Sequence, residues 1–192
     1  MKNILLINGH PDKESYCNAL ADAYKKGAQA SGATIREIIL ADLPFNPNLQ
    51  FGYRKRIELE PCLLEARENI QWAHHLVWIY PVWWGSFPAI LKGFIDRALL
   101  PGFAFKKKEN SLLWDKYLTG KTARIISTLD QPAWYYKWVY KQPSTNAMKK
   151  TVLHFCGIKP VKVTYIAPVR LSTLQWRKNW ISKVERLGFK QK

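Results

Sequence analysis

Short segments rich in hydrophobic and β-branched residues alternate along the chain with stretches in which apolar residues recur every three or four positions. The short segments cover residues 2–8, 34–40, 75–80, 122–128 and 161–167. The first contains an uninterrupted apolar run at residues 4–7, which is typical of a strand buried on both faces of a parallel sheet, and the stretches between the segments are typical of helices. The pattern therefore predicts an α/β protein with a doubly wound, five-stranded parallel sheet between two layers of helices.

Start and stop signals delimit the helices. Ser15 is a favourable N-cap for the first helix, and Pro61 occupies the first-turn position that proline favours in the second. Ser172 and Gln175 form a capping box at the start of the last helix, and Gly188 is expected to end it. The predicted helices cover residues 15–31, 61–73, 89–99, 144–156 and 172–188.

Three segments follow neither period. Residues 42–56 form a long excursion with two prolines and a basic cluster, and such excursions are often substrate-site or subunit-contact loops. Residues 101–120 are expected to be a loop. Residues 130–142 form an aromatic-rich segment.

Length and composition are those of one ordinary globular domain. The chain has 192 residues, of which 47% are hydrophobic and 23% charged, so we expect a single domain over residues 1–192. Three scattered cysteines without metal-ligand spacing indicate reduced thiols. The N-terminal apolar run is too short for a signal peptide, and the longest uncharged run, 76–91, is too short to cross a membrane. We therefore expect a soluble, cytoplasmic protein.

The chain is strongly basic, with a formal net charge of +16, and the imbalance is concentrated near its end. Residues 131–192 contain thirteen Lys or Arg and one acid, Glu185. Such a field attracts anions: nucleic acid, anionic lipid, an acidic partner or a phosphorylated cofactor. An ordinary solvated basic surface is an equally good interpretation. No nucleic-acid-binding motif accompanies the charge, so nucleic acid is not an expected partner.

Two unusual loops follow the first and third predicted strands, which are neighbours at the switch point of a sheet ordered 2-1-3-4-5. Residues 9–15 lead into a helix N-terminus, where free N–H groups bind phosphate, and His10 and Ser15 can add hydrogen bonds. This loop has neither the dinucleotide-binding glycine pattern nor a P-loop pattern, and an ordinary capped helix is the plainer interpretation.

The turn at residues 81–87 contains two adjacent tryptophans, Trp83 and Trp84, between a buried strand and a helix. Both rings cannot be in the core, so at least one is expected to face a cleft and lie against a flat heterocycle. An interface or surface patch is the alternative. A metal site is not expected, because the side chains of the adjacent His74 and His75 diverge.

Three stretches in chain order carry a recognisable pattern: Gly9-His10-Pro11 with Ser15, Tyr80-Pro81-Val82-Trp83-Trp84, and Pro88-Ala89-Ile90-Leu91-Lys92-Gly93-Phe94. Together they resemble the flavodoxin-like NAD(P)H:quinone oxidoreductase family, which includes small bacterial enzymes and regulatory flavoproteins of potassium-efflux systems. The match spans most of the chain in element order.

The resemblance implies the residues that hold a flavin. The phosphate and ribityl chain would be held by His10, Ser15, Tyr16 and Cys17. The isoalloxazine ring would be held by Pro81, Val82, Trp83, Trp84 and Gly85 and by the loop Thr128, Leu129, Asp130 and Gln131. Tyr135 or Tyr136 would assist proton transfer. The chain departs from the family at this loop, where Gln131 and Pro132 replace two glycines, and it has no histidine beyond the loop before His154.

The resemblance also implies the activity: hydride transfer from NAD(P)H through bound flavin to a quinone-like acceptor in ping-pong order. FMN and FAD both remain possible, and FMN is favoured because no long C-terminal extension is present to hold an adenosine. Family members form homodimers, so residues 44–60 and 133–140 are expected at the interface.

Three alternatives remain. A one-electron carrier would share the fold, but its T-x-T-G-x-T phosphate loop is missing. A regulatory subunit that docks on an acidic or membrane-associated partner would explain the charge. A nucleic-acid-binding protein would explain the charge but not the turn at 81–85.

Overall fold

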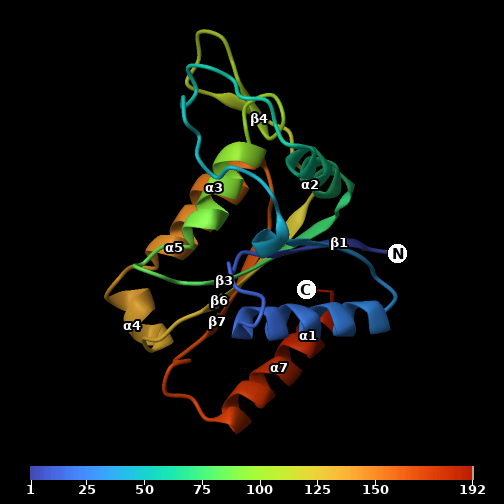
Figure 1. Ribbon diagram of the computed structural model, residues 1–192, viewed down its shortest axis with the longest axis vertical. Helices are drawn as coiled ribbons and strands as arrows, with labels where there is room; N and C mark the ends of the chain where they lie inside the picture. Colours follow the sequence, from blue (N-terminus) through green and yellow to red (C-terminus); the bar gives the residue numbers. More distant parts are fainter. Residues whose placement is uncertain (192) are drawn as a thin grey trace.

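The structure, a computed structural model, describes residues 1–191 and contains a five-stranded parallel sheet with helices on both faces (Figure 1). Lys192, the last residue of the predicted domain, lies outside the described residues. The strands are β1 (Asn3–Asn8), β2 (Thr34–Ile39), β3 (His75–Pro81), β6 (Thr122–Thr128) and β7 (Val161–Ile166). Their order, β2-β1-β3-β6-β7, confirms the predicted order 2-1-3-4-5. Strand β3 lies at the centre and is buried along its whole length.

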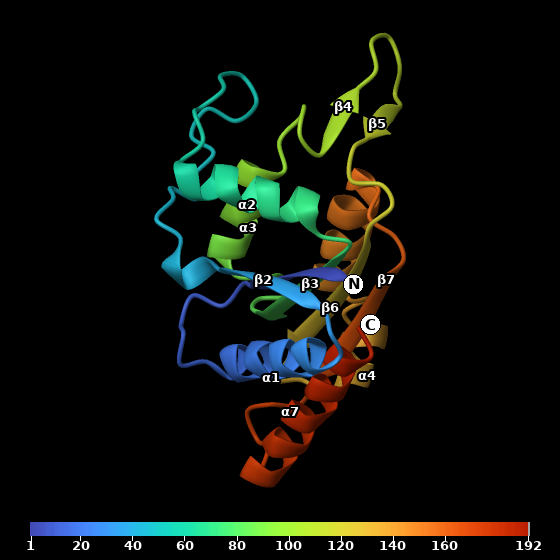
Figure 2. The same ribbon diagram turned by 90° about the vertical axis from the view of Figure 1, so that its right-hand side faces the viewer.

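Two layers of helices bury the two faces of this sheet (Figures 1 and 2). On one face lie α1 (Tyr16–Ala30) and α7 (Leu174–Phe189), which pack with Ile4, Leu6, Val77 and Ile79. On the other lie α2 (Pro61–Trp72), α3 (Ala89–Ala98) and the chain from 143 to 156, packed with Leu5, Ile7, Leu76 and Trp78. Successive residues of β1 and β3 alternate between these two cores, which explains why residues 4–7 and 76–80 are continuously hydrophobic.

Helices α1 and α7 lie side by side at a distance that only glycine permits. A Cβ on Gly27 would lie 1.9 Å from the Glu185 carbonyl oxygen, and one on Gly188 would lie 2.1 Å from the Tyr24 carbonyl oxygen. The prediction that Gly188 ends the last helix is therefore wrong: α7 continues to Phe189, and Gly188 is a packing residue within it.

The predicted start of this last helix is also displaced by one residue. Thr173 is the N-cap, because its hydroxyl accepts a hydrogen bond from the Trp176 N–H at 3.2 Å. The Ser172 hydroxyl instead donates to the Val169 carbonyl at 2.6 Å. Two adjacent hydroxyl residues can each cap a helix, and the preceding turn decides between them.

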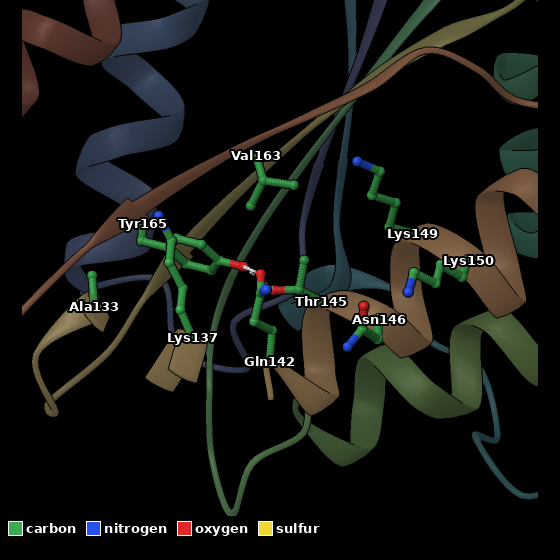
Figure 3. A pocket seen from close by; sticks show the side chains of 9 residues that line it. All are labelled: Ala133, Lys137, Gln142, Thr145, Asn146, Lys149, Lys150, Val163 and Tyr165. Atoms are coloured by element: carbon green, nitrogen blue, oxygen red, sulfur yellow. Dashed lines mark hydrogen bonds between the residues drawn. The ribbon is translucent and has the colours of Figure 1, made fainter. Parts of the chain in front are cut away.

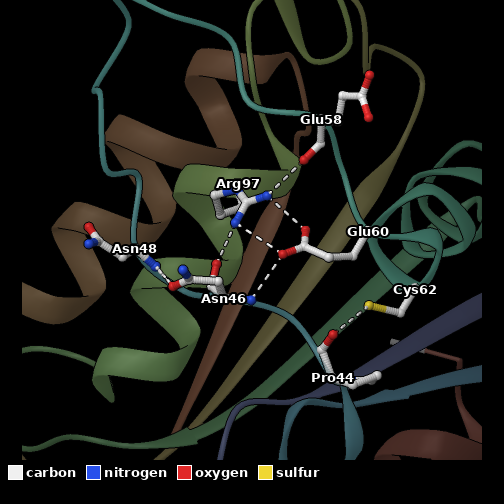
Figure 4. Close-up of polar contacts among 7 residues, drawn as sticks. All are labelled: Pro44, Asn46, Asn48, Glu58, Glu60, Cys62 and Arg97. Carbon is white, nitrogen blue, oxygen red and sulfur yellow. Dashed lines mark hydrogen bonds and ion pairs between the residues drawn. The ribbon is translucent and has the colours of Figure 1, made fainter.

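The excursion after β2 begins with a 3₁₀ turn, η1 (Leu40–Asp42), and is fixed to α3 by Arg97 (Figure 4). The Arg97 side chain is 2% exposed and pairs with the Glu60 carboxylate at 2.7 Å. It also donates to the backbone carbonyls of Asn46 and Glu58. The other end of the same carboxylate accepts from the Asn46 N–H at 3.0 Å. The excursion is thus held by a charge pair in which Arg97 is buried and Glu60 is partly exposed.

The predicted loop at 101–120 contains two short antiparallel strands, β4 (Phe105–Lys107) and β5 (Trp114–Lys116), so the prediction is wrong for these residues. Strands of three residues are too short to show a hydrophobic period. The hairpin is attached to the chain near 155: the Trp114 indole N–H donates to the Phe155 carbonyl at 2.8 Å, and the two rings stack with centroids 4.3 Å apart.

The largest difference from the predicted elements lies between residues 133 and 156, where a single helix was predicted at 144–156. This segment forms α4 (Ala133–Trp138), α5 (Pro143–Asn146), the π-helical segment η2 (Ala147–Leu153) and α6 (His154–Cys156). Before α5, Lys141 and Gln142 both adopt the left-handed conformation, with φ of 58° and 55°. Within residues 1–191, no helix is both long and apolar enough to cross a membrane.

Candidate functional site

The carboxyl ends of β3 and β6 border a cavity of about 650 Å³. Its lining consists of Val82, Trp83, Trp84, Gly85, Asp130, Gln131, Tyr136, Tyr140 and Pro143. The turn at 82–85 follows β3, the loop at 130–131 follows β6, and the loop after β1 reaches the cavity wall through His10. Ligands of doubly wound sheets bind at this edge, next to the switch point between β1 and β3.

The tryptophan turn is a two-residue hairpin. Trp83 and Ser86 exchange backbone hydrogen bonds of 2.9 and 2.8 Å, and the central residues Trp84 and Gly85 have φ of 50° and 73°. Turns of this type favour Asn-Gly, and a bulky residue in the left-handed region costs about 1–2 kcal/mol. The Trp84 side chain is 104% exposed, so no packing within the described protein compensates this cost.

The loop after β1 contacts the tryptophan turn. The His10 ring meets Trp83 edge to face with centroids 5.4 Å apart, and its Nδ1 accepts from the Asp12 N–H at 3.0 Å. Ser15 caps α1, and its hydroxyl accepts from the Asn18 N–H at 3.3 Å. The loop that contacts the tryptophan turn thus leads directly into this 15-residue helix, whose N-terminal N–H groups carry partial positive charge.

The side chains of Tyr16 and Cys17 have other partners. The Tyr16 hydroxyl donates to the Arg177 carbonyl at 3.0 Å, on α7. Cys17 is 2% exposed, and its Sγ lies 3.6 Å from the Thr128 hydroxyl. Burial raises the pKa of the Cys17 thiol to about 12, so the thiol stays protonated at neutral pH. At these two positions only the backbone N–H groups are suited to a phosphate.

In the loop after β6, the first residues make structural hydrogen bonds and the later ones line the cavity. The Val82 N–H donates to the Thr128 carbonyl at 2.9 Å, which joins this loop to the tryptophan turn. Leu129 is buried, and its N–H and carbonyl are both used, by Ile166 at 3.0 Å and Val169 at 2.9 Å. Asp130 and Gln131 line the cavity, whereas Thr128 and Leu129 do not.

The two candidate tyrosines have different positions. Tyr136 is 1% exposed, lines the cavity, and its hydroxyl accepts from the Thr145 N–H at 3.3 Å. Tyr135 does not line the cavity and packs edge to face against Tyr140, with centroids 5.0 Å apart. The geometry thus separates the pair that sequence left open.

Tyr140 and Pro143 line the cavity but were not predicted to do so. The left-handed residues Lys141 and Gln142 stand between them in the chain. Non-glycine residues rarely adopt this conformation, so nothing in the sequence indicates it. Among the described residues, no three His, Cys, Asp or Glu side chains are grouped as a metal site would need.

Comparison with known proteins gives consistent matches over the whole chain. The profile of a family described as having a flavodoxin-like fold matches residues 2–182. An uncharacterized NAD(P)H oxidoreductase of Haemophilus influenzae is 27% identical over 184 residues, covering 93% of this chain and 90% of the relative. The ribosyldihydronicotinamide dehydrogenase [quinone] of Rattus norvegicus is 24% identical over 221 residues, covering 97% and 92%.

Solved structures agree with these matches. A protein of Streptococcus mutans has a TM-score of 0.86 and 29% identity, covering 98% of this chain and 99% of its own. The NAD(P)H:quinone oxidoreductase of Methanothermobacter marburgensis has a TM-score of 0.84 and 20% identity, covering 100% and 99%, which supports the fold.

Proposed function

Because the chain belongs to the family of proteins with a flavodoxin-like fold, we propose that it is a flavin-dependent oxidoreductase that passes electrons from NAD(P)H to a quinone-like acceptor. The main support is Trp84, whose ring is fully exposed at the cavity in a strained backbone conformation. Such strain at a ligand cavity is typical of binding residues. The relatives named NAD(P)H oxidoreductase and quinone dehydrogenase supply the reaction class.

FMN is the proposed cofactor, and the cavity fits it in size and character. A volume of about 650 Å³ lies within the range of ligand pockets, and four of the nine lining residues are aromatic. A neighbouring fold, the NADH-azoreductase of Bacillus anthracis, is FMN-dependent and was solved with FMN. When bound, the flavin supplies the hydride and electron transfer.

The residues of this chain would orient the cofactor from two sides. Trp84, Trp83 and Val82 offer the apolar surface for the ring. His10, Ser15 and the backbone N–H groups of Tyr16 and Cys17 would bind the phosphate at the N-terminus of α1. Asp130 and Gln131 would border the ring edge, and Pro132 contributes no N–H there. Pro81, Gly85, Thr128 and Leu129 would act by shaping the turn and the loop rather than by side-chain contact.

Tyr136 is the proposed proton-transfer residue, in preference to Tyr135. Its hydroxyl accepts a hydrogen bond from the Thr145 N–H at 3.3 Å, and no hydrogen bond donated by this hydroxyl is found among residues 1–191. We propose that the hydroxyl would give its proton to a ligand atom in the cavity. Donor and acceptor would occupy the space beside the ring in turn, which gives the ping-pong order.

A second copy of the chain is proposed to complete the cavity. Large side chains are exposed on both segments expected at the interface: Tyr53 on the excursion, and Trp134 and Trp138 on α4, at 75%, 61% and 72%. Exposed aromatic groups of this kind mark contact surfaces.

The test is reduction of the FMN-loaded protein by NADPH without oxygen, followed by a quinone. We expect the visible flavin bands to bleach with NADPH and to return with the quinone. Bound flavin that NADPH does not reduce would refute the enzyme and favour a carrier or a regulatory subunit docking on an acidic or membrane-associated partner. A protein that binds neither FMN nor FAD would refute the cofactor assignment.

A further inference from the structure

A second cavity, of about 530 Å³, is bordered by α4, the edge strand β7, α5 and η2 (Figure 3). It shares no lining residue with the first cavity. Residues 131–143 contribute to both, so the same segment separates them. The lining residues are Ala133, Lys137, Gln142, Thr145, Asn146, Lys149, Lys150, Val163 and Tyr165.

The charge of this cavity is uncompensated. Lys137, Lys149 and Lys150 line it, no acidic residue does, and none of the three lysines forms an ion pair within the described part of the chain. The Lys137 ammonium lies 5.3 Å from the centre of the Tyr165 ring. Burial, followed by the charges of Lys149 and three other lysines, lowers the pKa of the nearby His154. The lysines thus create a positive potential that an anion would neutralise.

Polar side chains form one wall of the cavity. The Tyr165 hydroxyl lies 2.8 Å from both Gln142 Oε1 and Thr145 Oγ1 (Figure 3). The Tyr165 hydroxyl can donate to the Gln142 oxygen while it accepts from the Thr145 hydroxyl. The three groups therefore hold one another in place. Hydroxyl and amide groups fixed in this way add hydrogen-bonding capacity to the cationic wall.

Unusual backbone conformations build this cavity. Lys141 and Gln142 are consecutive left-handed residues, and the following π-helical segment carries Lys149 and Lys150. Each left-handed residue costs about 1–3 kcal/mol, and π-helical turns occur frequently at functional sites. The strain thus falls on the residues that bring Gln142 and the two lysines to one cavity.

We propose that this cavity binds a small phosphate-bearing anion. Three lysines match the charge of a phosphate or diphosphate group. A cavity of about 530 Å³ has the size for a small molecule, whereas an extended polyanion would bind to a flatter surface. The anion is either a free phosphate compound or the phosphate end of a nucleotide such as NADPH. The assignment does not depend on flavin binding in the first cavity.

The test is calorimetric titration of the purified protein with inorganic pyrophosphate, with and without FMN. The variant Lys149→Gln/Lys150→Gln removes two charges from the cavity. The matched control, Lys178→Gln/Lys190→Gln, removes two charges from exposed positions on and after α7. We expect saturable binding that weakens at least about tenfold in the cavity variant and less than about twofold in the control.

Equal weakening in both variants would overturn the proposal, because it would reduce the effect to general charge attraction. Absence of saturable pyrophosphate binding to the unmodified protein would overturn it as well. The two sources of the phosphate are distinguished by competition. If pyrophosphate displaces NADPH but not NADH, the site holds the 2′-phosphate of the nucleotide. If it displaces both, the site holds the diphosphate that the two nucleotides share. If it displaces neither, the site binds a separate phosphate compound.

Discussion

The two cavities on either side of residues 131–143 differ in the kind of side chain that lines them. The first is lined by rings and by backbone at the carboxyl edge of the sheet, with Asp130 as its one charged side chain. The second is lined by three lysines and by hydrogen-bonded side chains at the edge strand β7. The first is suited to a flat, uncharged ring and the second to an anion. The comparison therefore favours two ligand groups of different chemistry.

The largest expected effect concerns the cofactor phosphate. In His10→Ala/Ser15→Ala, FMN affinity should fall at least about a hundredfold, because each side chain would hydrogen-bond a charged phosphate, worth about 1.5–3 kcal/mol. Riboflavin, which lacks the phosphate, should bind with nearly unchanged affinity, measured by fluorescence titration. Pyrophosphate binding to the second cavity should also be unchanged. Equal losses for FMN and riboflavin would contradict the phosphate assignment.

A smaller effect should distinguish the neighbouring tyrosines. Tyr136→Phe should lower quinone turnover by about tenfold or more without changing FMN affinity, since general acid catalysis is lost while the ring packing stays. Tyr135→Phe is the control and should keep full turnover, because Tyr135 packs outside the cavity. Steady-state assays of both variants check this, and a loss confined to Tyr135→Phe would reverse the assignment.

The smallest effect is on stability and has opposite signs at adjacent positions. Trp84→Gly should stabilise the protein without flavin by about 0.5–1 kcal/mol, because glycine relieves the left-handed strain and no packing is lost. Gly85→Ala should destabilise it by about 1 kcal/mol, since φ of 73° disfavours alanine. Thermal unfolding, with shifts of about 2–4 °C per kcal/mol, measures both. Destabilisation by Trp84→Gly would show that the turn is not strained.

The two cavities also differ in how far sequence predicts them. Apolar runs and the N-cap Ser15 are local signals, so the five strands of the sheet and the start of α1 follow from them. The second cavity arises from Lys141, Gln142 and the π-helical segment, whose conformations depend on tertiary packing. Gly188 shows the same limit, because a glycine that ends a helix and one that admits a neighbouring helix look alike in sequence.

The resemblance to a known family adds information that local sequence signals and tertiary packing do not provide. It implies which residues would hold a flavin, but it does not distinguish side-chain from backbone roles. The Cys17 side chain faces Thr128 inside the core, and Tyr16 bonds to α7, so only their N–H groups suit the proposed site. Those roles depend on side-chain direction, which the structure supplies.

Contact between the flavin and the Trp84 ring is the central feature of the proposed site. The measurement is titration of FMN, followed by visible absorption, into the unmodified protein, Trp84→Ala and Leu112→Ala. Both side chains are almost fully exposed, but only Trp84 lines the first cavity, and Leu112 lies outside the two segments proposed for the interface. Loss of ring stacking worth about 1–3 kcal/mol predicts a tenfold to hundredfold weaker affinity in Trp84→Ala and no change in Leu112→Ala. Equal affinity in all three proteins would contradict the account.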